Sequence, residues 1–335
     1  MKKIIDEIIE RIDNSLEISE DDEVDILGYE SIKINKEKFN KIKKNNKKNK
    51  ICFVDGGNSE IIRASNFSLQ FIRVYYNVFK DNKKVKGKRY EFFVLVKAVN
   101  KDGIKYEVEF FNLNDLKVNK EDFSFDSFDK TIKTGEHRVN IAKIGEIARR
   151  FLELEVCNIA LNELESRDVL IMDRDLEVDI TNEEKFFSKL YENALKKKVI
   201  ISGLSKTTNL LTKGGNSANA LLNSLGNGKW YYRLLEGVYF VKLNEKAKYC
   251  FRFDISKKVK YDINEVLSLL VEQSKDPIFL GYPYGLVDAD KFARVSNNEK
   301  QYLRTMFMTK FGSKWSKIER YETSLDAHDV LDRVC

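Results

Sequence analysis

Two short apolar runs, each ending in an aspartate, constrain this chain more than any other feature of its sequence. Residues 51–57 read ICFVDGG, and residues 168–173 read DVLIMD. A short apolar run stopped by a carboxylate or by glycines predicts a buried strand, and the two glycines after Asp55 predict a tight turn. Ligands gather at strand ends in α/β sheets, so Asp55 and Asp173 are candidates for one site.

A long helix is predicted over residues 138–166, between the two runs. Apolar residues recur along it in steps of three and four, at Ile141, Ile144, Ala148, Phe151 and Ile159. Glu155 falls on this apolar stripe, whereas Glu153 falls on a more solvated side. A buried carboxylate is costly unless it is paired or binds a cation, so Glu155 joins the candidates.

The remaining patterns predict an α/β protein with a mixed sheet flanked by helices. An N-terminal part of residues 1–50 would hold a helix and a charged linker, and residues 51–335 would form the main domain. Further helices are expected over 3–16, 183–197, 262–274 and 288–308. Strands are expected over 67–79, 89–99, 104–113, 199–206, 231–242 and 248–255, with an antiparallel meander over 67–113 and a flexible loop over 207–229.

Composition limits the metals that such a site could use. The 335 residues include two His and four Cys, and no two cysteines form a CxxC pair. A structural zinc site and a disulfide scaffold are therefore not indicated. Oxygen ligands favour Mg²⁺ or Mn²⁺, and two such ions about 3.5–4 Å apart can promote phosphodiester hydrolysis. The alternative is that each aspartate only forms a turn or caps a helix.

Five segments, taken in order, resemble the NurA nuclease family. They are FVDGGNSEI (53–61), the helix with Glu155, VLIMDRDLE (169–177), ISGLSKTT (201–208) and GYPYGLVDADKFARVS (281–296). The resemblance covers about residues 3–332 and is carried by the order and spacing of short motifs. It implies an RNase H-like core with N- and C-terminal helical additions, a homodimer, and a Mn²⁺-dependent (or Mg²⁺-dependent) DNA nuclease. It also implies a HerA-like hexameric ATPase as partner in DNA end resection.

The resemblance implies roles for particular residues. Asp55 and Asp173 correspond to metal ligands, and so does a glutamate of the long helix, for which Glu155 fits the apolar stripe better than Glu153. Tyr282 and Asp290 stand eight residues apart, at the separation of a Tyr and a His in the family motif. Asp290 could serve as a further metal ligand, but an aspartate is a poor proton donor at pH 7. A second departure is Arg174 where the family has glycine, which changes the turn after Asp173.

Basic and aromatic residues near these motifs are candidates for DNA binding. Lys206 could approach a scissile phosphate, Arg63 and Arg73 could contact the backbone, and Tyr284, with Tyr282, could stack on a base. Each has a structural alternative, as a surface cation or a core residue. The acidic residues 17–25 and the lysine-rich residues 31–50 could serve either HerA or DNA.

The carboxylates favour a metal-dependent phosphodiesterase, and the resemblance implies a DNA nuclease that acts as a 5′–3′ exonuclease and/or single-strand endonuclease in end resection and recombinational repair. A second hypothesis is a non-catalytic DNA-binding or adaptor subunit, and a third is an RNase H-like enzyme acting on RNA. We expect a cytoplasmic protein without a membrane segment, because charges interrupt every apolar run.

Overall fold

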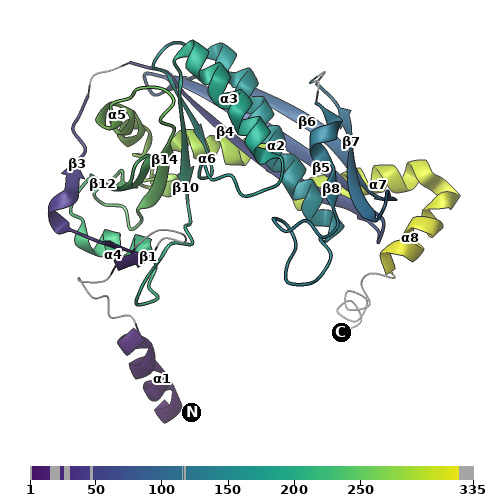
Figure 1. Ribbon diagram of the computed structural model, residues 1–335, viewed down its shortest axis with the longest axis horizontal. Coiled ribbons are helices and arrows are strands. Elements are labelled where there is room, and N and C mark those ends of the chain that lie inside the picture. The colour runs from purple at the N-terminus through teal and green to yellow at the C-terminus, as the bar shows by residue number, and fades with distance from the viewer. Residues whose placement is uncertain are drawn as a thin grey trace. The chain divides into compact units, whose positions relative to one another are not determined.

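The chain forms two compact units. The computed structural model describes residues 2–15, 23–25, 31–45, 48–114, 116 and 118–323 (Figure 1). Unit 1 comprises Met1–Asn49, Ile171–Leu176 and Ile200–Tyr284, and unit 2 comprises Lys50–Leu170, Glu177–Val199 and Gly285–Cys335. The predicted division after residue 50 falls beside the first of these boundaries, but unit 1 also takes two later segments.

Unit 2 is built on a meander of strands. These are β4 (Ile51–Arg63), β5 (Phe67–Lys80), β6 (Lys83–Asn100), β7 (Ile104–Asn112) and β8 (Phe125–Asp126), and consecutive strands pair antiparallel. The first two residues of β9 (Val169–Met172) also belong to unit 2, and β9 is next to β4 in the strand order. The interior of β5 is buried throughout, as expected for a central strand with a covered face on each side.

In the described part of unit 2, five α-helices accompany these strands. They are α2 (Ile141–Ala160), α3 (Glu183–Lys197), α6 (Tyr284–Ala293, its first residue in unit 1), α7 (Asn297–Phe311) and α8 (Trp315–Thr323), with 3₁₀ turns at Lys120–Phe123 (η2), Leu161–Glu163 (η3) and Gly312–Lys314 (η5). Helix α2 packs against β4, β5 and β6 on one side and against α3 on another (Figure 1).

The prediction of a single helix over 288–308 is wrong, because two helices occupy this segment. Helix α6 ends at Ala293, and α7 begins after Ser296. The Ser296 side chain accepts a hydrogen bond from the Glu299 backbone N–H at 3.2 Å. This serine is an N-cap, which starts a new helix where the periodicity alone indicated continuation.

Unit 1 contains two sheets. The larger has the order β3-β12-β13-β14-β10-β9, and the smaller has the order β11-β1-β2. The strands are β1 (Glu23–Asp25), β2 (Ile32–Lys33), β3 (Phe39–Lys41), β10 (Ile200–Ser205), β11 (Leu211–Thr212), β12 (Trp230–Leu235), β13 (Val238–Lys242) and β14 (Phe251–Ile255). The helices are α1 (Lys2–Ser15), α4 (Ala218–Leu225) and α5 (Ile263–Gln273), with 3₁₀ turns at Lys36–Lys38 (η1) and Pro277–Phe279 (η4).

Two predictions for unit 1 need correction. Residues 231–242 form a hairpin, because Gly237 has φ +86° and turns the chain between β12 and β13. The predicted loop over 207–229 contains β11 and α4. Leu221 and Leu222 of α4 are buried in the same apolar cluster as Trp230, so packing holds this glycine- and asparagine-rich segment in a helix.

The element order confirms the predicted fold class. Three antiparallel strands, β4 to β6, are followed by α2 and then by β9, α3 and β10. The strand order is β6-β5-β4-β9 in unit 2, and β9 is next to β10 in unit 1. This connectivity is that of an RNase H-like core, with helices added at both ends of the chain.

Among the described residues, three cysteines are buried, and they are distributed over the two units. Cys52 and Cys157 belong to unit 2, and Cys250 belongs to unit 1. Burial raises the pKa of the Cys250 thiol to about 12 and also raises the pKa of Cys52. At neutral pH these thiols are protonated and react slowly.

Among the described helices, none has the length and apolar character that crossing a bilayer requires.

Candidate active site

Asp55 lies within a long strand, not at a strand end. Strand β4 continues through Gly56 and Gly57 to Arg63 and stays paired with β5, so the predicted turn after Gly57 is wrong. The four residues before Asp55 are buried, and Asp55 itself is half-buried. Its Oδ1 accepts a hydrogen bond from the Gly56 backbone N–H at 2.8 Å. The aspartate is therefore held at the point where the strand leaves the apolar core.

Asp290 brings a second carboxylate to Asp55. It is an exposed residue of α6, and one of its carboxylate oxygens lies within 4.8 Å of a carboxylate oxygen of Asp55. Two like charges at this separation repel each other, so a cation would stabilise the pair. The donors are oxygen atoms, which is the ligand type that Mg²⁺ and Mn²⁺ prefer. The residues present therefore fit a hard divalent cation.

Glu153 of α2 also lies beside this part of β4. A Cβ atom added to Gly56 would come within 2.4 Å of Glu153 Oε1, so any larger residue here would displace the Glu153 side chain. Glu153 is buried and forms an ion pair with Arg149, one helical turn earlier. Arg149 also donates a hydrogen bond to the Gly56 carbonyl oxygen at 3.1 Å.

Arg149 supplies positive charge to this region. The pKa of its guanidinium is raised, chiefly by the Glu153 carboxylate and further by Asp55, while burial acts in the opposite direction. Arg149 was not among the predicted site residues, and Glu153 was predicted to lie on the solvated side of the helix. Their i, i+4 spacing was the available signal, but it is also typical of ordinary surface pairs.

The structure buries Glu153 of α2 and covers most of Glu155, so the prediction that Glu153 is solvated is wrong. Glu153 is 7% exposed, and the Glu155 side chain is 12% exposed and forms an ion pair with Lys189 of α3 at 2.7 Å. Helix α2 packs against the sheet and against α3, so it is buried around most of its circumference. The stripe argument assumed one buried face, and it therefore placed Glu153 in solvent. The metal-ligand role predicted for Glu155 stays a prediction.

In unit 1, Asp173 contacts two other predicted site residues, Tyr282 and Lys206. It directly follows β9 and accepts a hydrogen bond from the Tyr282 hydroxyl at 2.6 Å. Lys206, the residue after β10, forms an ion pair with Asp173 at 2.6 Å, and its Nζ lies 5.3 Å from the centre of the Tyr282 ring. Tyr282 is 1% exposed, so its hydroxyl is held firmly toward Asp173. The structure thus brings three sequence-predicted residues together.

Arg73 has a structural role in this fold. Its side chain is 7% exposed and forms ion pairs with Glu91 and Glu299, and it donates a hydrogen bond to the Arg294 carbonyl oxygen. Through these contacts the guanidinium holds α7 against β5 and β6. Its donors are engaged inside the protein, which argues against the predicted contact with a DNA phosphate.

The other two predicted DNA-binding residues lie at element ends. Arg63 ends β4 and Tyr284 begins α6, and both are half-buried. Their predicted contacts with DNA stay predictions.

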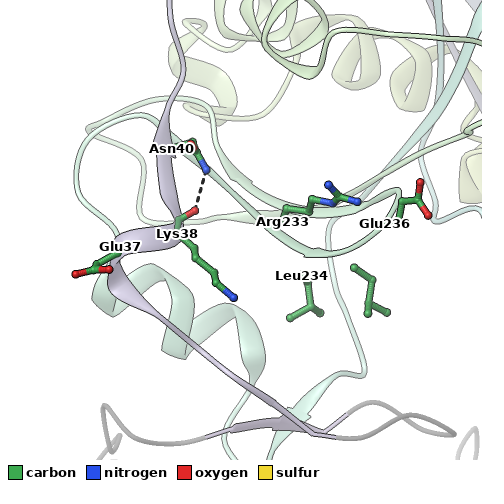
Figure 2. A pocket seen from close by; sticks show the side chains of 7 residues that line it. Glu37, Lys38, Asn40, Arg233, Leu234 and Glu236 are labelled. Carbon is green, nitrogen blue, oxygen red and sulfur yellow. Dashed lines mark hydrogen bonds between the residues drawn. The ribbon is translucent and has the colours of Figure 1, made fainter.

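A separate pocket in unit 1 lacks the predicted site residues. It has a volume of about 470 Å³ and is lined by Glu37, Lys38, Asn40, Arg233, Leu234, Leu235 and Glu236 (Figure 2). Both signs of charge line it in equal number, and Asn40 donates a hydrogen bond to the Lys38 carbonyl oxygen at 2.8 Å. Such a lining shows no preference for an anionic or a cationic ligand.

No family model and no curated protein matches the sequence. Among solved structures, the chain is similar to the NurA nuclease from Sulfolobus solfataricus, with 13% identity and a TM-score of 0.47 over 82% of this chain and 88% of that one. It is also similar to human endonuclease V, with 12% identity and a TM-score of 0.39 over 77% and 86% of the two chains. A third match is endonuclease V from Ciona intestinalis bound to inosine-containing DNA, with 12% identity and a TM-score of 0.38 over 78% and 89%. The family that the sequence motifs resemble is thus represented among the similar structures.

Proposed function

We propose that this chain is a divalent-cation-dependent DNA nuclease. The observation that carries the proposal is the pair of carboxylates, Asp55 and Asp290, with oxygens within 4.8 Å of each other. We propose Asp55, Asp173 and Asp290 as cation ligands. Glu153 replaces Glu155 as the proposed helix ligand, because it lies beside Gly56 while Glu155 is engaged with Lys189.

The sequence motif supports the inclusion of Asp173. Residues 169–177, VLIMDRDLE, resemble the NurA segment in which the corresponding aspartate is a metal ligand.

The proposed mechanism divides the work among residues of this chain. A bound Mn²⁺ or Mg²⁺ would supply an activated water and stabilise charge on the leaving oxygen. The Tyr282 hydroxyl orients the Asp173 carboxylate, because its hydrogen bond fixes one of the two oxygens. Lys206 is 40% exposed and lies beside Asp173, so it can contact a substrate phosphate and hold it in place. Asp290 serves as a cation ligand and not as a proton donor.

The NurA-like motifs support finer proposals. We infer 5′–3′ exonuclease and/or single-strand endonuclease activity in DNA end resection and recombinational repair. A HerA-like hexameric ATPase would supply the energy of translocation, and the chain would act as a homodimer. Mn²⁺ is the preferred ion in this proposal.

A second proposal is a non-catalytic DNA-binding or adaptor subunit, favoured by Asp290 at the family's histidine position. The test is an Mn²⁺ titration with end-labelled single-stranded DNA, duplex DNA and RNA in parallel. Cleavage of DNA that requires Mn²⁺ supports the nuclease. Binding without cleavage at any Mn²⁺ concentration supports the adaptor, and preferential cleavage of RNA would overturn the choice of substrate.

A further inference from the structure

A buried carboxylate on α6 has no part in the proposed function. Asp288 is 7% exposed and accepts hydrogen bonds from Asn77 Nδ2 of β5 at 2.8 Å and from Lys84 Nζ of β6 at 2.7 Å. Asn77 Nδ2 also donates to the Gly285 carbonyl oxygen, at the start of α6, at 2.9 Å. A buried charge is tolerated when it is paired in this way. One polar cluster therefore joins α6 to two neighbouring strands.

Lys84 is held between the helix and the sheet by two neighbouring aromatic rings as well as by its charge. Its Nζ lies 4.6 Å from the centre of the Phe292 ring on α6 and 5.3 Å from that of the Tyr75 ring on β5. The two rings themselves are 5.1 Å apart. An ammonium group near two aromatic rings and a carboxylate has few alternative positions, so it limits the movement of α6.

Close backbone packing fixes the two ends of α6 on β4. A Cβ atom at Gly285 would come within 2.0 Å of the Phe53 ring, and one at Gly57 would come within 2.5 Å of the Ala293 carbonyl oxygen. The helix therefore rests on the strand that carries Asp55. Between these two ends, the Asp288 cluster sets the rotation of the helix about its axis.

The rotation of α6 decides where Asp290 points. Two positions along an α-helix correspond to about 200° of rotation, so Asp288 and Asp290 project to nearly opposite sides. Asp288 faces the sheet, and Asp290 is the exposed member that approaches Asp55. Without the attachment through Asp288, α6 would keep only the contacts at its two ends, and a small rotation between them would move the Asp290 carboxylate away from Asp55.

We propose that Asp288, through Asn77 and Lys84, is a positioning residue that holds the Asp290 carboxylate beside Asp55. The inference rests on the proposed cation site. Groups that orient ligands in this way typically contribute about 10–100-fold to metal affinity or activity.

The test compares three variants of the full chain. Asp288→Asn keeps the shape of the side chain and removes its charge. Lys84→Met keeps the aliphatic stem between the rings and removes the ammonium. Lys86→Ala is the matched control, because Lys86 lies on the same strand and pairs with Glu163, which is outside α6. Mn²⁺ binding is measured by calorimetry, DNA cleavage by titration with Mn²⁺, and hydrogen exchange of the α6 amides in metal-free protein.

We expect Asp288→Asn and Lys84→Met to bind Mn²⁺ about tenfold more weakly than the wild type, with faster exchange of the α6 amides. Lys86→Ala should match the wild type. Unchanged Mn²⁺ affinity in folded Asp288→Asn and Lys84→Met would overturn the positioning role. If Asp288→Asn does not fold, Lys84→Met decides, because its side chain is 33% exposed and its loss is easier to tolerate. Failure of the proposed function is distinguishable, because the wild type itself would then bind no Mn²⁺, which would overturn both proposals.

Discussion

The two aspartates that follow the apolar runs have different partners within their own units. In unit 1, Asp173 is balanced by the ammonium of Lys206 and by a hydrogen bond from Tyr282. In unit 2, Asp55 has Asp290 within 4.8 Å and Glu153 beside the next residue of its strand. Arg149 offsets part of this negative charge. A balanced carboxylate is stable as it stands, whereas a group of acidic side chains is stabilised by a bound cation.

The comparison separates two kinds of function. Asp55 and Asp290 are expected to govern how strongly a cation binds. Asp173 is also a proposed cation ligand, but Lys206 already balances its charge, so its cluster is expected to contribute less to cation affinity and more to the orientation of a substrate phosphate. Substitutions in unit 2 should therefore have larger effects on metal dependence than those in unit 1.

Asp55→Ala tests the comparison most strongly. Loss of this carboxylate should lower Mn²⁺-dependent cleavage by more than about 10³-fold, because a bound cation supplies several kcal/mol of transition-state stabilisation. Cleavage of labelled DNA is the measurement, with circular dichroism to show that the fold is retained. The control is Asp102→Asn. Asp102 lies in an exposed turn and has a positive φ, a backbone conformation that asparagine also tolerates. Retained Mn²⁺-dependent cleavage in Asp55→Ala would refute the cation site.

The two glutamates of α2 offer a matched pair of substitutions. Glu153→Gln should lower cleavage by about 10²-fold and weaken Mn²⁺ binding, because Glu153 lies beside Gly56. Glu155→Gln removes an ion pair with Lys189 and should leave cleavage near the wild-type rate. Calorimetric titration of both variants with Mn²⁺ is the measurement. The opposite ranking would restore Glu155 as the ligand.

Tyr282→Phe tests the balanced cluster in unit 1. Removing the hydroxyl takes away the 2.6 Å hydrogen bond to Asp173 and should slow cleavage by about tenfold. The Mn²⁺ concentration at half-maximal activity should change little. Tyr261→Phe is the control, because its hydroxyl lies 3.3 Å from that of Tyr239. An equal loss of activity in both variants would assign the effect to general destabilisation.

A third carboxylate, Glu299, is paired with Arg73, and this pair is expected to affect the stability of the fold without affecting cleavage. Its hydrogen bond to Arg73 lowers the pKa of its carboxyl below the usual 4.5. A lowered pKa in the folded state contributes stability above the unfolded-state pKa, and this stability is lost as the pH falls through the folded value. Urea unfolding at pH 7 should show Glu299→Gln to be less stable than the wild type. The difference should narrow below about pH 4.5, and a difference that stays constant with pH would exclude this linkage.

Much of the fold followed from the sequence because apolar periodicity reports burial. The meander over 67–113, the helices near 183–197 and 262–274, and the strands before Asp173 and Lys206 were all predicted within a few residues. The errors occurred where tertiary contacts decide. The turn expected after Gly57 is a continuous strand, because its pairing with β5 persists along β4.

The candidate site was predictable as a set of residue types but less well as an arrangement. Asp173, Lys206 and Tyr282 were each predicted as site residues, and the structure has them in contact. The positions of Glu153 and Arg149 could not be deduced, because a helix covered on two sides has no single apolar stripe. The attachment of Asp288 depends on contacts with Asn77 and Lys84, more than 200 residues earlier in the chain, and no local pattern reports such a contact.

The buried cysteines give the protein its own reporters of unfolding. A thiol reagent reaches Cys250 only when unit 1 opens, and it reaches Cys52 only when unit 2 opens. In a background carrying Cys157→Ala and Cys335→Ser, the labelling rates of these two thiols would measure the opening free energy of each unit in the same sample. Added Mn²⁺ or DNA would then reveal which unit a ligand protects, without any engineered probe.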